Sequence, residues 1–206
     1  METDVEIKNR ICSAAREEFY LHGFNKVTVD EIAAKLGMSK KTIYKYFPSK
    51  DDLVLEVTRS TITQMDQCCQ GFLNDESADF VAKLKNMMTF VAMQYAKMGK
   101  PLMEDLERNA PHIWKEIDQY RSESIMLYFG NLLKEGREKG VFRTDVDHEL
   151  VLMIYNNAIQ NIIRPGFLIH VSYSAAQVFD AIVKIIFEGI LTDDAKPKYL
   201  SKNAAL

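Results

Sequence analysis

Hydrophobic residues recur every three or four positions through most of this chain, which is the spacing of amphipathic helices. Proline is scarce, and no stretch alternates strictly between apolar and polar residues between hairpin turns. The pattern therefore predicts an all-α fold. About nine helices are expected, and they cover roughly residues 4–21, 29–36, 40–47, 50–72, 78–98, 101–109, 111–136, 147–164 and 174–191.

Capping residues divide the N-terminal part into short helices. The stretch T-V-D-E at 28–31 is a capping box, with Thr28 as N-cap and Glu31 at the third helical position. Gly37 ends that helix, Ser39 caps the next one two residues later, and Pro48 stops it. Helix, tight glycine turn and helix in this order predict a helix-turn-helix between residues 29 and 47.

The second helix of this motif has two distinct faces. Ile43 and Phe47 are four residues apart, so they share a face and are expected to pack against the apolar side of the preceding helix. That arrangement turns Lys41, Thr42, Tyr44 and Lys45 outward and leaves Lys40 and Tyr46 on the flanks.

The charge of the chain is unevenly distributed. The 206 residues carry a net charge of −3, yet residues 1–50 hold nine Lys/Arg against seven Asp/Glu, and five lysines but no acid follow Ile32 up to Lys50. A solvated helix face has this composition, and so does a face that binds phosphates. Its place on the second helix of a helix-turn-helix favours the second interpretation, because that helix enters the major groove of DNA. The helix starts at Thr28, Ser39 and Ser49 add free backbone N–H groups.

The segment T-V-D-E-I-A-A-K-L-G-M-S-K-K-T-I-Y-K-Y-F-P-S-K-D-D-L, residues 28–53, resembles the DNA-binding domain of the TetR family of transcriptional repressors. The upstream A-A-R-E-E-F-Y-L-H-G-F, 14–24, is similar to the first helix of that family, and G-V-F-R-T-D-V-D, 140–147, to a loop common before its eighth helix. The specific resemblance covers about a quarter of the chain.

The resemblance implies double-stranded DNA with a palindromic operator as the partner. The side chains expected to contact DNA are Thr28, Ser39, Lys40, Lys41, Thr42, Tyr44, Lys45, Tyr46 and Lys50. Among these, Lys40, Lys41 and Thr42 are expected at base edges or neighbouring phosphates, and the tyrosines and Lys50 at phosphates. The recognition helix lacks Arg, Asn and Gln, the side chains best suited to bidentate base reading. Asp30 is unusual so close to DNA, and we interpret it as a helix-capping residue.

Two domains are expected: a three-helix DNA-binding domain over residues 1–50, and a helical effector-binding and dimerisation domain over 51–206, joined by the fourth helix. The last two helices, about 147–164 and 174–191, are apolar on more than one side. Either both helices lie in the centre of the fold, or a partner covers their second apolar side. The resemblance implies a homodimer in which they form a four-helix bundle.

Methionine and aromatic residues in the helices between 78 and 164 form either ordinary core or an apolar effector pocket. The candidate effector-binding residues are Met88, Met93, Trp114, Tyr120, Met126, Phe129, Tyr155, Asn157 and Asn161. The amides of Asn157 and Asn161 interrupt an apolar run. They could bond a ligand, pair across the dimer or face solvent.

No cofactor, metal site or enzymatic activity is expected. The four histidines are scattered, and the Glu-x-x-His pairs of a di-iron bundle are missing. Cys12, Cys68 and Cys69 have neither disulfide nor zinc spacing, so we interpret them as reduced thiols, with a Cys68/Cys69 redox sensor as the alternative. The acidic N-terminus does not look like a signal peptide, and no run of about 18 apolar residues occurs, which predicts a cytoplasmic protein without a membrane partner.

The sequence thus predicts a dimeric transcriptional repressor that a small, largely apolar effector releases from DNA. The alternative is a helix-turn-helix regulator that a partner protein or thiol oxidation controls.

Overall fold

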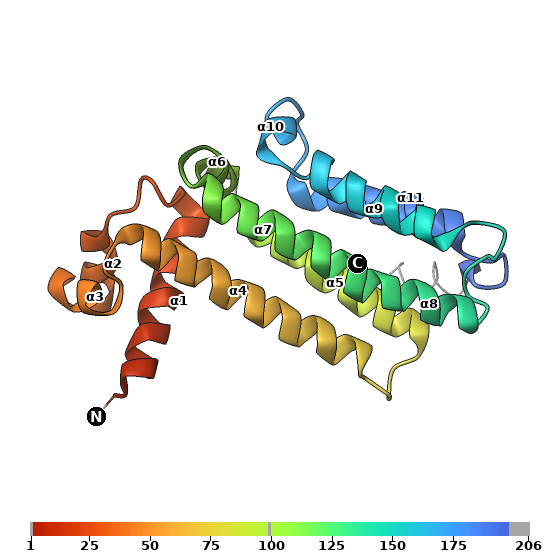
Figure 1. Ribbon diagram of the computed structural model, residues 1–206, viewed down its shortest axis with the longest axis horizontal. Coiled ribbons are helices and arrows are strands. Elements are labelled where there is room, and N and C mark those ends of the chain that lie inside the picture. Colours follow the sequence, from red (N-terminus) through yellow and green to blue (C-terminus); the bar gives the residue numbers. More distant parts are fainter. Residues whose placement is uncertain (1, 99, 198–206) are drawn as a thin grey trace. The chain divides into compact units, whose positions relative to one another are not determined.

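The computed structural model describes residues 2–98 and 100–197, and within them helices form the architecture (Figure 1). The only β feature of these residues is an isolated antiparallel bridge between Phe142 and Leu191. The all-α prediction is confirmed. The helices are α1 (Asp4–His22), α2 (Val29–Leu36), α3 (Lys40–Tyr46), α4 (Lys50–Leu73), α5 (Phe80–Lys97), α6 (Lys100–Asn109), α7 (Pro111–Ser124), η1 (Ile125–Phe129), α8 (Gly130–Glu138), α9 (His148–Ile162), α10 (Pro165–Leu168) and α11 (Ala175–Ile190).

Two predicted elements differ in detail. The long helix expected from Pro111 onward is α7, a π-helical turn η1, and α8 in succession; the N–H of Gly130 reaches the carbonyl of Ile125, five residues back. Pro165, which follows the helix predicted over 147–164, starts a further short helix. It is the first residue of α10, where its missing N–H costs no hydrogen bond.

The chain separates into two compact units. Of the described residues, the first unit contains 2–65 together with those of Lys97–Ile117, and the second contains Asp66–Ala96 and 118–197. The separation concerns packing, so the functional boundary at residue 50 stays a prediction. Each unit has its own buried apolar residues.

In the first unit, α1 packs against α2 and α6. The chain leaves α1 at Gly23, whose φ of 78° lies in the region that favours glycine. A β-carbon there would collide with the carboxylate of Asp105 on α6. That carboxylate accepts the backbone N–H of Asn25 at 2.9 Å, so the turn after α1 is tied to α6.

In the second unit, aromatic side chains form the centre. The ring of Phe129 lies 4.3 Å from that of Tyr155 and 5.2 Å from that of Phe187, measured between centroids. These rings join η1, α9 and α11, and α9 packs alongside α11 (Figure 1).

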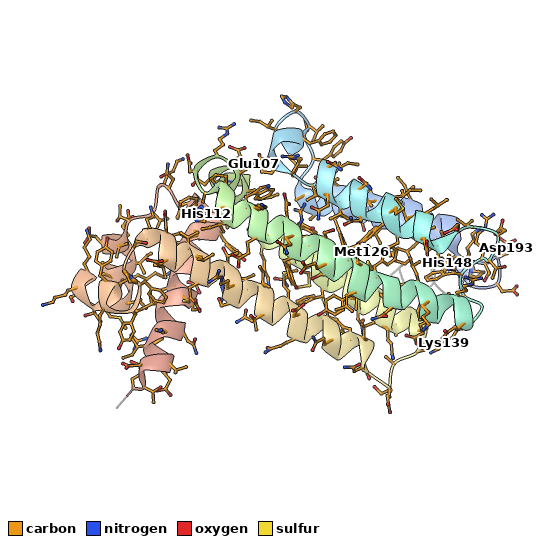
Figure 2. The ribbon with its side chains drawn as sticks, viewed as in Figure 1. Glu107, His112, Met126, Lys139, His148 and Asp193 are labelled. Carbon is orange, nitrogen blue, oxygen red and sulfur yellow. The ribbon has the colours of Figure 1, made fainter. Side chains whose placement is uncertain are left out.

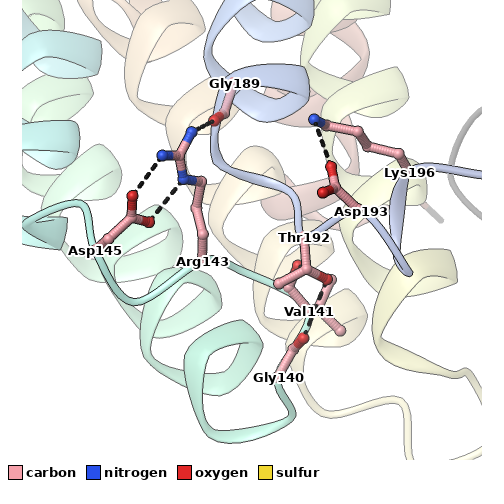
Figure 3. A network of polar contacts seen from close by, with 8 residues as sticks. All are labelled: Gly140, Val141, Arg143, Asp145, Gly189, Thr192, Asp193 and Lys196. Atoms are coloured by element: carbon pink, nitrogen blue, oxygen red, sulfur yellow. Dashed lines mark hydrogen bonds and ion pairs between the residues drawn. The ribbon is translucent and has the colours of Figure 1, made fainter.

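The loop after α8 is fastened to the end of α11 (Figure 3). The guanidinium of Arg143 pairs with Asp145 and donates to the carbonyl of Gly189 at 3.3 Å, while the hydroxyl of Thr192 donates to the carbonyls of Gly140 and Val141 at 3.3 Å. This network fixes the point from which α9 starts.

None of the helices within the described residues has both the length and the apolar character that a membrane crossing requires.

Candidate nucleic-acid interface

The structure forms the predicted helix-turn-helix from local signals. The hydroxyl of Thr28 accepts the N–H of Glu31 at 3.2 Å, and the Glu31 carboxylate accepts the N–H of Thr28 at 2.7 Å, which completes the capping box. Gly37 ends α2 in the left-handed conformation, with φ of 64°. The hydroxyl of Ser39 then caps α3 by accepting the N–H of Thr42 at 3.0 Å.

The apolar side of α3 is buried as its spacing predicts. Ile43 and Phe47 are buried, as are Ile32 and Ala33 of α2, and α2 packs against α3. This packing fixes which face of α3 remains accessible.

The predicted DNA-contacting side chains lie on the remaining surface. Thr28, Ser39, Lys40, Lys41, Tyr44 and Lys45 are exposed, whereas Thr42, Tyr46 and Lys50 are half-buried. Four of the nine are cations, and the other five are hydroxyls. Ammonium and hydroxyl groups on one surface can contact phosphates without reading sequence. Their contacts with DNA stay a prediction.

Two carboxylates of the chain itself engage this surface. The Asp30 carboxylate accepts a hydrogen bond from the Lys40 ammonium at 2.7 Å. The Asp4 carboxylate, at the start of α1, accepts the Tyr46 hydroxyl at 2.7 Å and lies 3.9 Å from the Lys45 ammonium.

These contacts shift the pKa values of the groups that donate. The hydrogen bond to Asp30 raises the pKa of Lys40, and the hydrogen bond to Asp4 raises the pKa of Tyr46. Lys50 is different: it donates to the carbonyl of Asn25 at 3.3 Å, and partial burial lowers its pKa.

Sequence reasoning missed the roles of both aspartates. The structure shows that Thr28 and Glu31 cap α2, while the Asp30 side chain pairs with Lys40 in place of capping. Asp4 is 42 positions from Tyr46, and no sequence signal connects them.

The candidate effector residues are distributed over both units. In the second unit, Met88, Phe129 and Tyr155 are buried together, and the Tyr155 hydroxyl points to the sulfur of Met88 at 3.9 Å. Trp114 is buried in the first unit. Their role in binding stays a prediction.

The remaining candidate effector residues also differ in how far they are buried. Tyr120 is half-buried and donates to the Asp66 carboxylate at 3.2 Å, an oxygen that also accepts the Tyr128 hydroxyl at 2.6 Å. Asn157 and Asn161 are exposed on α9, where each side chain donates to a backbone carbonyl of its own helix. Met93 and Met126 are exposed as well. Met126 lies on η1 (Figure 2).

The three cysteines are free thiols. Burial raises the pKa of Cys12 to about 11 and that of Cys69 to about 12, whereas Cys68 is exposed. Within residues 2–98 and 100–197, no three His, Cys, Asp or Glu side chains lie close enough together to hold a metal ion.

A helix-turn-helix whose second helix presents lysines and tyrosines is typical of DNA-binding transcriptional regulators. Residues 11–57 match the family described as bacterial regulatory proteins, tetR family. The N-terminal part of the chain therefore matches the DNA-binding segment of the TetR family, whose members are DNA-binding regulators rather than enzymes.

The proteins to which this chain is similar are named as transcriptional regulators, and each match extends along most of both chains. The uncharacterized HTH-type transcriptional regulator YvaF of Bacillus subtilis is 26% identical over 167 residues, covering 81% of this chain and 87% of that protein. The HTH-type transcriptional repressor KstR2 of Mycolicibacterium smegmatis is 24% identical over 189 residues, covering 89% of this chain and 90% of that protein. The structure of the fatty acid degradation regulator FadR from Bacillus halodurans shares the fold, with a TM-score of 0.61, 21% identity, and coverage of 88% and 95%.

Proposed function

We propose that this protein is a homodimeric repressor that binds a palindromic operator in the cytoplasm and leaves it when a small, largely apolar effector binds. The observation that carries the proposal is the accessible face of α3, where lysines and tyrosines lie on the second helix of a fully formed helix-turn-helix. Repression is supported by the name of the similar KstR2 protein.

An apolar stripe on α9 supports the dimer. Leu150, Met153 and Ile154 are more than half exposed, and Asn157 and Asn161 continue the same helical face at spacings of three, four and seven residues. On α11, Ile185 is 74% exposed. Large apolar side chains at this spacing are expected to be buried by a second copy. A two-fold dimer would present two recognition helices about one DNA turn apart, roughly 34–36 Å.

The interior of the second unit supports an apolar effector. Met88, Phe129 and Tyr155 come from three elements and are adaptable or aromatic, as the walls of apolar ligand sites are. Two similar proteins carry names that refer to fatty acids and ketosteroids. The effector is proposed to favour a dimer whose recognition helices no longer match the spacing of the operator.

The raised pKa values of Cys12 and Cys69 favour this proposal over control by thiol oxidation. The thiolate is the reactive form, and burial disfavours it at both positions. Among the described residues, only Cys68 is an exposed thiol. Because we propose no control by oxidation, Cys68→Ser and the wild type should bind DNA with the same affinity in oxidising buffer.

Fluorescence anisotropy with DNA from upstream of the gene tests the proposal. The expected result is tight, salt-sensitive binding to one segment and weaker binding to a scrambled duplex of equal length. Equal affinity for every duplex, or no binding at low salt, would reject the repressor proposal.

Release is tested on the complex so obtained. A long-chain fatty acid and a ketosteroid are titrated into the protein–DNA complex. Separately, native mass spectrometry of the purified protein detects any small molecule that copurifies with it. We expect at least one apolar compound to lower the anisotropy. Tyr155→Phe should preserve operator binding while changing the compound's half-effective concentration.

A further inference from the structure

Two of the three lysines of the recognition helix already face carboxylates in the free protein. Lys40 is held by Asp30 at 2.7 Å, and Tyr46 and Lys45 face Asp4 at 2.7 and 3.9 Å. In contrast, no hydrogen bond or ion pair engages the Lys41 ammonium within the described residues, although Lys41 lies in the same turn as Lys40. The helix therefore offers one unheld lysine beside two held ones.

Both pairs are accessible from solvent. The side chains of Asp30 and Lys40 are 65% and 47% exposed, and those of Asp4 and Lys45 are 75% and 68% exposed. A phosphate can therefore reach the donors without any rearrangement of the backbone. It competes with a carboxylate there, because the Asp30 and Asp4 oxygens take donor positions that phosphate oxygens would otherwise fill.

We propose that Asp30 and Asp4 are intramolecular competitors of DNA phosphate, and that they limit the sequence-independent part of DNA affinity. This inference rests on the proposed function, since it concerns the same surface. Each carboxylate must give up its donor when DNA binds, and it then remains close to the phosphates and repels them. Neither aspartate is needed to build the helix-turn-helix, whose caps are supplied by Thr28, Glu31 and Ser39.

Counterion release gives the competition a measurable signature. Nearly all non-specific affinity comes from cations that neutralise phosphates, and each such contact adds about 0.9 to the slope of log affinity against log salt. A lysine that exchanges a carboxylate for a phosphate contributes less than this.

The experiment compares the full-length wild type with Asp30→Asn, Asp4→Asn and the double variant. Anisotropy is measured with a fluorescein-labelled duplex of random sequence between about 50 and 200 mM salt. We expect each single variant to bind roughly tenfold more tightly at the lowest salt and to steepen the slope by up to about 0.9. Asparagine keeps the size of the side chain, and thermal melts followed by circular dichroism verify that each variant is folded.

Two controls separate local competition from a change of net charge. Asp145→Asn changes the charge by the same amount and frees Arg143 from an exposed pair in the second unit, so it should leave the affinity and the slope nearly unchanged. In a Lys40→Gln background, Asp30→Asn should give little gain, because the donor that it frees is gone. Tyr46→Phe with Lys45→Gln is the corresponding background for Asp4→Asn.

The possible outcomes are distinct. Unchanged affinity and slope in the aspartate variants, or equal gains in Asp145→Asn, would overturn the inference while leaving the proposed function intact. A loss of affinity in Asp30→Asn would also overturn it, since Asp30 would then be contacting DNA itself, as an acceptor for a cytosine amino group for example. If neither the wild type nor any variant binds DNA, the proposed function fails together with the inference.

Discussion

The recognition helix α3 and helix α9 of the second unit both present side chains that a single chain does not bury, but they do so with opposite chemistry. On α3 the exposed groups are charged, and the chain supplies partners such as Asp30 for Lys40. On α9 they are apolar, and Ile154 remains 61% exposed. A charged surface can be satisfied by exchangeable ion pairs, whereas an apolar surface is satisfied only by burial.

This difference sets what each partner must do. DNA has to compete with carboxylates for the α3 donors, so its binding is expected to be reversible and dependent on salt. A second copy of the chain has nothing to displace on α9. The dimer is therefore expected to be long-lived, and its dissociation constant is expected to be nearly independent of salt.

The largest expected effect is the response of the two surfaces to salt. Between about 50 and 200 mM, affinity for operator DNA should fall by about a thousandfold, because several phosphate contacts release counterions. The dimer dissociation constant should change by less than about threefold, because apolar burial is not screened. Anisotropy measures the first and sedimentation equilibrium the second. Parallel salt dependence of both quantities would contradict the assignment of α9 to the dimer.

A charge in the apolar stripe should break the dimer. Burial of one large apolar side chain contributes about 1.5–3 kcal/mol, and two-fold symmetry buries Ile154 twice. Ile154→Glu should therefore raise the dimer dissociation constant by at least roughly 100-fold. Light scattering after size exclusion measures the mass, and operator affinity should fall with it. Leu21→Glu is the matched control, because it places the same charge at an exposed apolar residue at the opposite end of α1 from Asp4.

The two neighbouring lysines of α3 should differ in their effect. Lys41→Gln removes an ammonium that no ion pair in the described structure holds, and should weaken DNA binding roughly tenfold per recognition helix at low salt. Lys40→Gln should cost less, because Lys40 must first leave Asp30. The comparison uses anisotropy, with Lys134→Gln on α8 as an exposed control. Equal losses at positions 40 and 41 would show that the Asp30 contact has no influence on binding.

The helix-turn-helix could be predicted from sequence because its signals are local. The capping box at Thr28 and the left-handed Gly37 each act within four residues, and the structure has both. The Asp4–Tyr46 contact depends on how α1 packs, and the local pattern carries no information about it. The π-helical turn η1 was not predicted for a related reason. Apolar spacing alone does not distinguish hydrogen bonds between residues five positions apart from the ordinary ones between residues four positions apart.

The second unit was harder to interpret because periodicity identifies apolar faces but not what covers them. Phe129 and Asn157 were both candidate effector residues, yet the structure buries the first among aromatic rings and exposes the second beside Met153 and Ile154. The sequence alone could not distinguish these positions, since an amide within an apolar run is compatible with a ligand, a partner or solvent.

The smallest expected effect concerns that amide. The Asn157 side chain donates to the carbonyl of Met153 at 3.0 Å, so its own helix satisfies part of its hydrogen bonding. On a dimer face, a buried asparagine costs stability relative to an apolar residue. Asn157→Leu should therefore strengthen the dimer by roughly 3–10-fold, measured by sedimentation equilibrium, and leave the effector's half-effective concentration unchanged. A changed effector response with an unchanged dimer would instead assign Asn157 to the ligand, and the apolar stripe of α9 would then end before position 157.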